Sequence, residues 1–205
     1  MRRFFLFAVA ALALALPTSG KASVWEIDLA HSSAQFAIRH LMVSTVRGEF
    51  TKFSGTFTLD DKDLAKSTLE ASIDVTSINT RIAKRDDHLK GPDFFDVAKY
   101  PTMTFKSKKV EAAGEGKFKV TGDLTMHGVT KEVVLDVTGS TKSIKDPMGK
   151  MRLGGSATTK INRKDFGLAY NRTLETGGVL VGEEVDITID VEMTEKADAA
   201  ASAAK

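Results

Sequence analysis

The sequence predicts an all-β protein with one short helical segment, in which antiparallel strands form a closed barrel or a sandwich. Apolar and polar residues alternate along most of the chain, turn sequences separate these runs, and one charged stretch breaks the alternation. A period of two is typical of strands with one buried and one solvated face. Repeated hairpins with a consistent apolar face favour a barrel, because closure removes exposed sheet edges.

The first 22 residues are expected to form a secretory signal peptide and not part of the fold. Arg2 and Arg3 precede an apolar run over residues 4–16, and small residues fit a cleavage site near Ala22. The run is short for a transmembrane helix, and a retained membrane anchor is the alternative. The leader therefore predicts export.

Charge and composition exclude several functions. The chain has 29 basic and 27 acidic residues, and loss of Arg2, Arg3 and Lys21 with the leader takes the formal charge from +2 to −1. No basic excess remains to attract nucleic acid. Cysteine is absent, which excludes thiol catalysis and thiolate metal sites. We expect one domain over residues 23–194 and a disordered, alanine-rich tail over residues 195–205.

Five stretches show the alternation most clearly. They cover residues 33–40, 53–59, 69–75, 117–126 and 185–193. Threonine, valine and isoleucine, which suit a pleated surface, are frequent in them. Turn residues separate the runs, and we expect about eight to ten strands. The turn sequences lie at residues 60–63, 113–116, 127–128, 146–149 and 176–178.

The charged stretch over residues 79–101 interrupts the strands. Residues 81–90 are expected to form two or three helical turns that end at Gly91-Pro92. Phe94 and Phe95 follow in an irregular segment. A loop of this length in a compact barrel is usually functional or a cover. A second irregular stretch spans residues 158–184.

Histidines and serines near the first strand raise the question of catalysis or metal binding. Asp28, His31, Ser32 and Ser33 lie close in sequence, but no G-x-S-x-G surrounds a serine. The alternative interpretation is that His31 and Ser32 hydrogen-bond the backbone of a turn. No H-x-H or H-E-x-x-H occurs, so a metal site would need histidines that converge in space.

Short motifs, each weak alone, follow one another in a specific order. They are Asp28-x-x-His31-Ser32, Gly48-x-Phe50-x-x-Phe53-x-Gly55, Ser77-Ile78-Asn79-Thr80, Arg85-Asp86-x-His88-Leu89, Asp93-Phe94-Phe95-Asp96, Gly122-Asp123-Leu124-Thr125-x-His127-Gly128 and Ile161-Asn162-Arg163-x-Asp165-Phe166-Gly167. In order and spacing this set resembles the YceI-like family of periplasmic polyisoprenoid-binding proteins, over nearly all of the chain after the leader.

The resemblance implies a lipocalin-like antiparallel β-barrel that encloses an elongated apolar tunnel. It implies a periplasmic, non-enzymatic binding or carrier protein for a long-chain lipid, often linked to transport or stress response. The ligand would be an isoprenoid, such as a quinone-related or prenyl lipid, or an acyl lipid. It would be held non-covalently, with no other cofactor and no metal.

Residue types and strand parity then indicate which side chains would contact the lipid. Arg85 or His88 would hold a polar headgroup, and Phe94 and Phe95 would cover one end. Ala71 and Gly122 would leave room in the wall. The expected ligand-binding residues are Phe36, Ile38, His40, Phe57, Ile73, Arg85, His88, Phe94, Phe95, Phe105, Leu124 and Met126.

Two other functions stay open, as do several partners. One is a lipid-modifying enzyme with His40 or His88 as acid-base, which turnover would reveal. The other is a ligand-free interaction domain with a filled core, which would extract no lipid. A carrier would contact a membrane or a membrane protein transiently, and the sequence also admits a homodimer.

Overall fold

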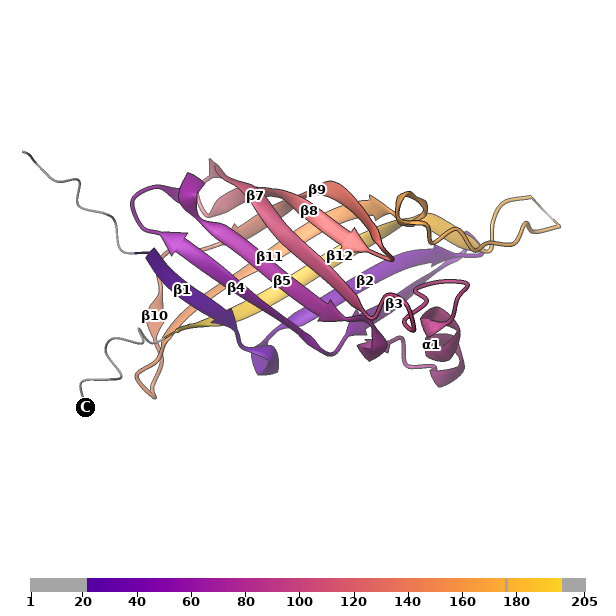
Figure 1. The fold of residues 1–205 in the computed structure, drawn as a ribbon, viewed down its shortest axis with the longest axis horizontal. Helices are drawn as coiled ribbons and strands as arrows, with labels where there is room; N and C mark the ends of the chain where they lie inside the picture. The colour runs from indigo at the N-terminus through magenta and orange to yellow at the C-terminus, as the bar shows by residue number, and fades with distance from the viewer. Residues whose placement is uncertain (1–21, 176, 197–205) are drawn as a thin grey trace, which may run out of the picture.

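The protein, described here by a computed structural model over residues 22–175 and 177–196, is an elongated barrel of antiparallel strands (Figure 1). The predicted fold class is confirmed. One short helix, α1 (Ala83–Lys90), lies at one end. The strands are β1 (Ala22–Ile27), β2 (Ser33–His40), β3 (Ser44–Phe50), β4 (Phe53–Asp60), β5 (Thr68–Asp74), β6 (Ile78–Asn79), β7 (Thr102–Gly114), β8 (Lys117–Met126), β9 (Val129–Gly139), β10 (Ile144–Lys145), β11 (Met151–Asn162) and β12 (Val181–Glu195).

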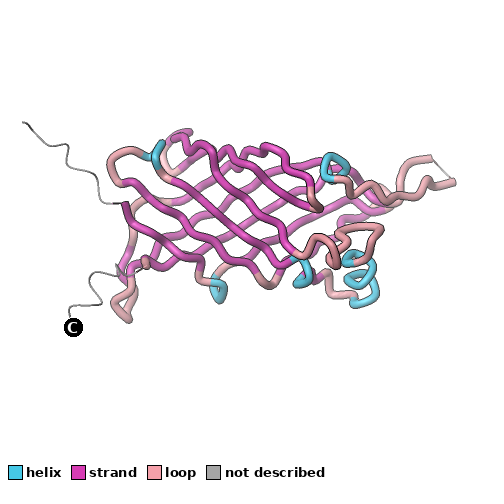
Figure 2. The backbone as a smooth tube through the Cα atoms, in the orientation of Figure 1, coloured by secondary structure: helices cyan, strands magenta, loops and turns pink. Residues whose placement is uncertain are grey.

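Closure of the barrel depends on β12. One edge of this strand pairs with β11 and the other pairs with β2 and then β1, so β1 and β2 share one position in the wall. In the same way β3 continues into β4, and β6 continues β5. With β7, β8 and β9, this makes a closed barrel of eight strand positions. Figure 2 shows that strands make up nearly the whole body.

Short 3₁₀ turns connect several of the strands. η1 (Leu29–His31) separates β1 from β2, and the Asp28 carboxylate accepts from the Ala30 N–H at its start. η2 (Leu64–Lys66) and η3 (Val75–Ser77) are capped in the same way by Asp63 and Asp74. Aspartate is common at such positions because its carboxylate accepts a hydrogen bond from a backbone N–H that has no partner within the turn.

The helix begins two residues later than the predicted stretch and ends where expected. Arg81 has a positive φ of 68°, which prevents it from joining the helix, and Asp86 accepts from the Thr80 N–H across this bend. None of the residues of α1 is buried. No helix in the described ranges is long and apolar enough to cross a membrane.

The strands extend one residue beyond the expected range of the domain at each end. Ala22, the last residue of the predicted leader, pairs with Asp60, and the rest of the leader lies outside the described residues. Glu195, expected to start a disordered tail, ends β12, because that strand continues along β1 opposite Trp25. The Lys196 N–H donates to the Val24 carbonyl at 2.7 Å, and residues 197–205 lie outside the described part.

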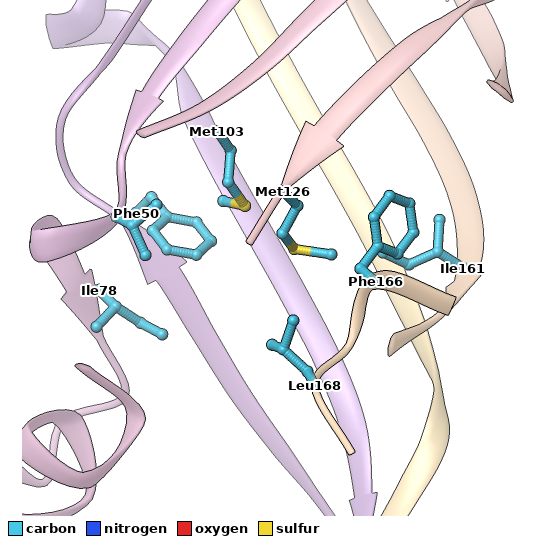
Figure 3. Close-up of a cluster of buried hydrophobic side chains, with 8 residues drawn as sticks. Phe50, Ile78, Met103, Met126, Ile161, Phe166 and Leu168 are labelled. Carbon is cyan, nitrogen blue, oxygen red and sulfur yellow. The ribbon is translucent and has the colours of Figure 1, made fainter. Parts of the chain in front are cut away.

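The second irregular stretch is shorter than expected. Its first five residues belong to β11 and its last four to β12, which leaves residues 163–180 outside these strands. η4 (Arg163–Phe166) opens this segment. Buried side chains at the end near α1 form a cluster that Leu89 and Phe95 pack against. Figure 3 draws this cluster and labels Phe50, Ile78, Met103, Met126, Ile161, Phe166 and Leu168.

Candidate functional site

A cavity of about 470 Å³ runs inside the barrel. Every position of the wall contributes to its lining, because alternate side chains of a strand point to the same face. Almost all of the exposed lining is apolar. The volume lies within the range of pockets that hold one small ligand. The barrel is therefore not a filled core.

All twelve predicted ligand-binding residues line this one cavity. Eight come from strands, and Arg85, His88, Phe94 and Phe95 come from α1 and the segment after it. Their position is as expected, and their role in binding stays a prediction. The strand residues are Phe36, Ile38, His40, Phe57, Ile73, Phe105, Leu124 and Met126.

Gly122 does not leave room in the wall. A Cβ built on this glycine would meet the Phe105 ring at 2.5 Å, because the ring lies across the glycine from the neighbouring strand. Phe36 covers Gly48 in the same way. The space beside each glycine is therefore occupied by an aromatic side chain. Ala71, the other small residue expected in the wall, does line the cavity.

The sequence pattern missed part of the wall, most clearly in β9. Val133 and Leu135 line the cavity, while Val134 between them points outward and is 42% exposed. Three consecutive apolar residues hide the parity of this strand, and the neighbouring Lys131 and Glu132 give no further guide. The pairing of β9 with β8 and β11, which shows which residues face inward, is apparent only in three dimensions.

Aromatic rings gather at the end of the cavity near α1. Phe94 is buried, and its ring lies 4.9 Å from that of Tyr170 and 5.1 Å from that of His88. Nε2 of His88 is 2.9 Å from Oδ2 of Asp93. The His88–Phe94 contact is edge-to-face and the Phe94–Tyr170 contact is tilted, and such ring pairs favour one fixed arrangement. Phe94 and Phe95 thus lie where a cover was predicted. Tyr170 also belongs to this aromatic group, although nothing in the sequence of its irregular segment indicated this.

Arg85, one of the two residues expected to hold a headgroup, and His40, another polar residue of the predicted lining, differ in their surroundings. Arg85 donates from Nε and Nη2 to the hydroxyl and carbonyl oxygens of Thr80, both at 2.7 Å, so its guanidinium is held by its own loop. His40 faces the cavity at the end of β2, and among the described residues its imidazole has no hydrogen-bond partner. The imidazole of His40 is therefore free to hydrogen-bond a ligand. The guanidinium of Arg85 can still donate from the N–H groups that Thr80 does not use.

Arg163 is a buried cation that the sequence did not single out as a site. It is 3% exposed, and its guanidinium donates to the carbonyl oxygens of Gly182 at 2.7 Å, Val181 at 3.3 Å and Leu168. Burial lowers the pKa of this guanidinium, and the Glu183 carboxylate acts in the opposite direction. Arg163 thus ties the irregular segment to the start of β12 beside the cavity.

The residues that suggested a catalytic triad do not form one. Nδ1 of His31 is 3.0 Å from Oδ2 of Asp28, but the Ser32 hydroxyl donates to the Asp28 carbonyl at 2.8 Å and accepts from the Glu192 N–H. The alternative interpretation, in which Ser32 serves the backbone of a turn, is the one observed. His31 is bound to a side chain and not to the backbone.

A metal ion bound at the same place would compete with the guanidinium of Arg152. Ligand atoms of Asp28, His31 and Glu192 lie within 4.8 Å of one another. Nη1 of Arg152 lies 2.6 Å from the Asp28 carboxylate and 3.0 Å from that of Glu192, and its Nε donates to Asp146. The guanidinium therefore supplies the positive charge that these carboxylates need.

The Asp28 carboxyl should make the free energy of unfolding depend on pH in the acidic range. Its pKa is lowered from 3.8 to about 2, first by the hydrogen bond with His31 and then by that from Arg152. A carboxyl with a depressed folded-state pKa contributes stability above its unfolded pKa and loses it as the pH falls through the folded value. Asp28→Asn should lower the free energy of unfolding at neutral pH, and its difference from wild type should shrink between about pH 4 and about pH 2. Urea unfolding at several pH values measures this.

The control for this prediction is Asp190→Asn, an exposed aspartate on β12. Its difference from wild type should be smaller at neutral pH. An Asp28→Asn difference that stays constant down to about pH 2 would contradict the role of this carboxylate.

A closed antiparallel barrel with an internal apolar cavity defines a lipocalin-like barrel, a class whose interior can hold one small ligand. The family model for the YceI-like domain matches residues 25–193. The chain belongs to this family, as the resemblance predicted.

Relatives and solved structures agree with this assignment. A UPF0312 protein of Vibrio parahaemolyticus is 42% identical over 158 residues, which cover 76% of this chain and 83% of that protein. The crystal structure of BcnA from Burkholderia cenocepacia matches with a TM-score of 0.71 at 27% identity, covering 81% of this chain and 98% of BcnA. A polyisoprenoid-binding domain from Saccharophagus degradans matches with a TM-score of 0.60 at 17% identity, covering 84% and 98%, which shows a shared fold.

Proposed function

We propose that this protein binds one long-chain amphiphilic lipid in its cavity and carries it through the bacterial periplasm. The observation that carries the proposal is a cavity inside the barrel whose exposed lining is almost wholly apolar, with His40, Arg85 and His88 among its few polar side chains. Burial of each CH₂ of a lipid contributes about 0.8 kcal/mol. A polar ligand would lose its hydrogen bonds with water and find few in return.

A polyisoprenoid, such as a quinone-related or prenyl lipid, is the proposed ligand, with a fatty acyl lipid as the alternative. The name of the Saccharophagus degradans domain supports the first choice. His40 and His88 would contact the headgroup, since they combine a polar ring with positions on the cavity wall. The predicted leader supports the periplasmic location, and the link to stress response comes from the family resemblance.

Binding without catalysis is supported by the surroundings of His40, because no described side chain hydrogen-bonds its imidazole. A general acid-base needs a partner that orients it toward a reacting group. Conversion of an added lipid to a product, lost in His40→Ala, would contradict this part of the proposal.

Native mass spectrometry tests the proposal directly. The protein, purified from its exported compartment without detergent, should carry one bound lipid, which extraction then identifies. A bare mass that stays unchanged after incubation with prenyl and fatty lipids would contradict the carrier function and favour an interaction domain. The same spectra report whether the protein forms the homodimer that the sequence admits.

A further inference from the structure

The turn between β2 and β3 presents three consecutive apolar residues to solvent. Leu41, Met42 and Val43, here called the β2–β3 tip, are 38%, 53% and 77% exposed. The tip lies at the right-hand end of the barrel in Figure 1, on the side of α1 and away from β10. Single exposed apolar residues are common, but a continuous group marks a surface that contacts something else.

The backbone of the tip is also unfavourable for its residues. The Val43 N–H donates to the His40 carbonyl at 3.1 Å, which closes a four-residue turn around Leu41 and Met42. Both central residues have positive φ, 52° and 60°. Asparagine and glycine adopt this hairpin conformation easily, whereas leucine and methionine do not. Strained backbone and exposed apolar side chains both oppose the folded state in water, a combination that points to function.

The tip continues into the wall of the cavity. His40, which precedes the tip, lines the cavity, and the Leu41 N–H donates to the Leu180 carbonyl at 2.8 Å. Leu180 and Val181 line the cavity as well. An apolar chain that enters beside the tip would therefore meet the cavity wall within one or two residues.

Two arginines give the tip a positive border. Arg39 donates from Nη2 to the Met42 carbonyl at 2.7 Å and from Nη1 to the Thr45 hydroxyl at 3.0 Å, which holds its guanidinium at the base of the turn. Arg47 is exposed on the adjacent strand. Residues 37–48 contain these two arginines and no acid, although the exported chain is expected to carry a net charge of −1. Guanidinium groups beside an apolar tip are complementary to lipid phosphates above an acyl layer.

We propose that the β2–β3 tip docks the protein on an anionic lipid bilayer and that lipid enters the cavity from this end. Entry of lipid rests on the proposed function, whereas docking can be tested alone. The hairpin of β10 and β11 at the opposite end is the rival surface, with Ile144 69% and Met148 76% exposed. Its turn places Gly149 and not an apolar residue at positive φ, so nothing there is strained.

The variant Leu41→Asn/Met42→Gly tests docking. It removes two apolar side chains and installs the residues that this turn favours, so the fold should be at least as stable as in wild type. Co-sedimentation with vesicles of phosphatidylcholine and phosphatidylglycerol should show binding about tenfold weaker than wild type, since less apolar surface enters the bilayer. The matched control Ile144→Ser/Met148→Ser should bind within about twofold of wild type.

Equal binding by wild type and Leu41→Asn/Met42→Gly, or a larger loss in Ile144→Ser/Met148→Ser, would overturn the proposal. Wild type that stays in the supernatant with these vesicles would also overturn it and leave the tip to a protein partner. Weaker binding to vesicles of phosphatidylcholine alone supports the role of the arginines.

A second measurement separates docking from cavity function. Wild type and Leu41→Asn/Met42→Gly should bind a fluorescent fatty acid offered free in solution equally well, while the variant takes it up more slowly from vesicles. Equal uptake from vesicles would contradict entry at this end. Wild type that binds no free ligand would contradict the proposed function and leave the vesicle result to decide docking.

Discussion

Replacing Arg163 by methionine should lower the free energy of unfolding by about 3 kcal/mol. Methionine fills similar space, but it leaves the carbonyls of Gly182 and Leu168 without the donors that Arg163 supplies, whereas the Val181 carbonyl keeps the hydrogen bond from the Asn171 amide. A buried acceptor that loses its partner keeps the full penalty of its lost hydration. Urea unfolding of the variant and wild type under the same conditions measures the difference.

Arg172→Met is the matched control for this prediction. Arg172 belongs to the same irregular segment as Arg163, but its side chain is exposed. This substitution should change the free energy of unfolding by less than about 0.5 kcal/mol. Equal effects of the two substitutions would mean that the bonds from Arg163 to Leu168, Val181 and Gly182 do not stabilise the fold.

Ala157→Trp should abolish most lipid binding while the fold survives. Ala157 lies on β11 opposite Ile189 and Val137, and it faces the cavity. A larger side chain in a packed core would cause strain, but here it can enter the space of about 470 Å³. Excluding only two methylene groups of the lipid removes about 1.6 kcal/mol, more than tenfold in affinity. Titration with a fluorescent prenyl or fatty lipid measures the loss.

The control is Ala37→Trp, which adds the same side chain to the outer face of β2. Ala37 pairs with Asp186 and Arg47 and lies between two residues that face the cavity. Its variant should bind lipid as wild type does. If both variants bind equally well, the lipid does not occupy the cavity near Ala157, and the site must be sought elsewhere.

The sequence predicted the fold and much of the cavity wall because side chains alternate strictly along a strand. Phe36, Ile38 and Leu124 could be assigned to one interior from parity alone, and the length of the irregular loop indicated a cover around Phe94. Parity gave no guide in β9, where three apolar residues follow one another.

Features that depend on contacts between distant residues could not be predicted. Arg163 is satisfied by carbonyls that follow 5 and 19 residues later, and no local pattern announces such an arrangement. The turn at Leu41 contains no glycine, asparagine or proline, so it was absent from the expected turns. Gly122 was expected to leave space because the ring of Phe105 on the adjacent strand was not known to lie over it.

The position of β12 in the wall has a consequence for how the chain folds. The last strand pairs with β1 and β2 on one side and with β11 on the other. Until it arrives, the earlier strands form an open sheet with two unpaired edges, a state prone to association with other chains. Its contacts with β1 and β2 also join residues from opposite ends of the sequence, which slows folding. The barrel can therefore close only when almost the whole chain is available, whatever route brings it to the place where it folds.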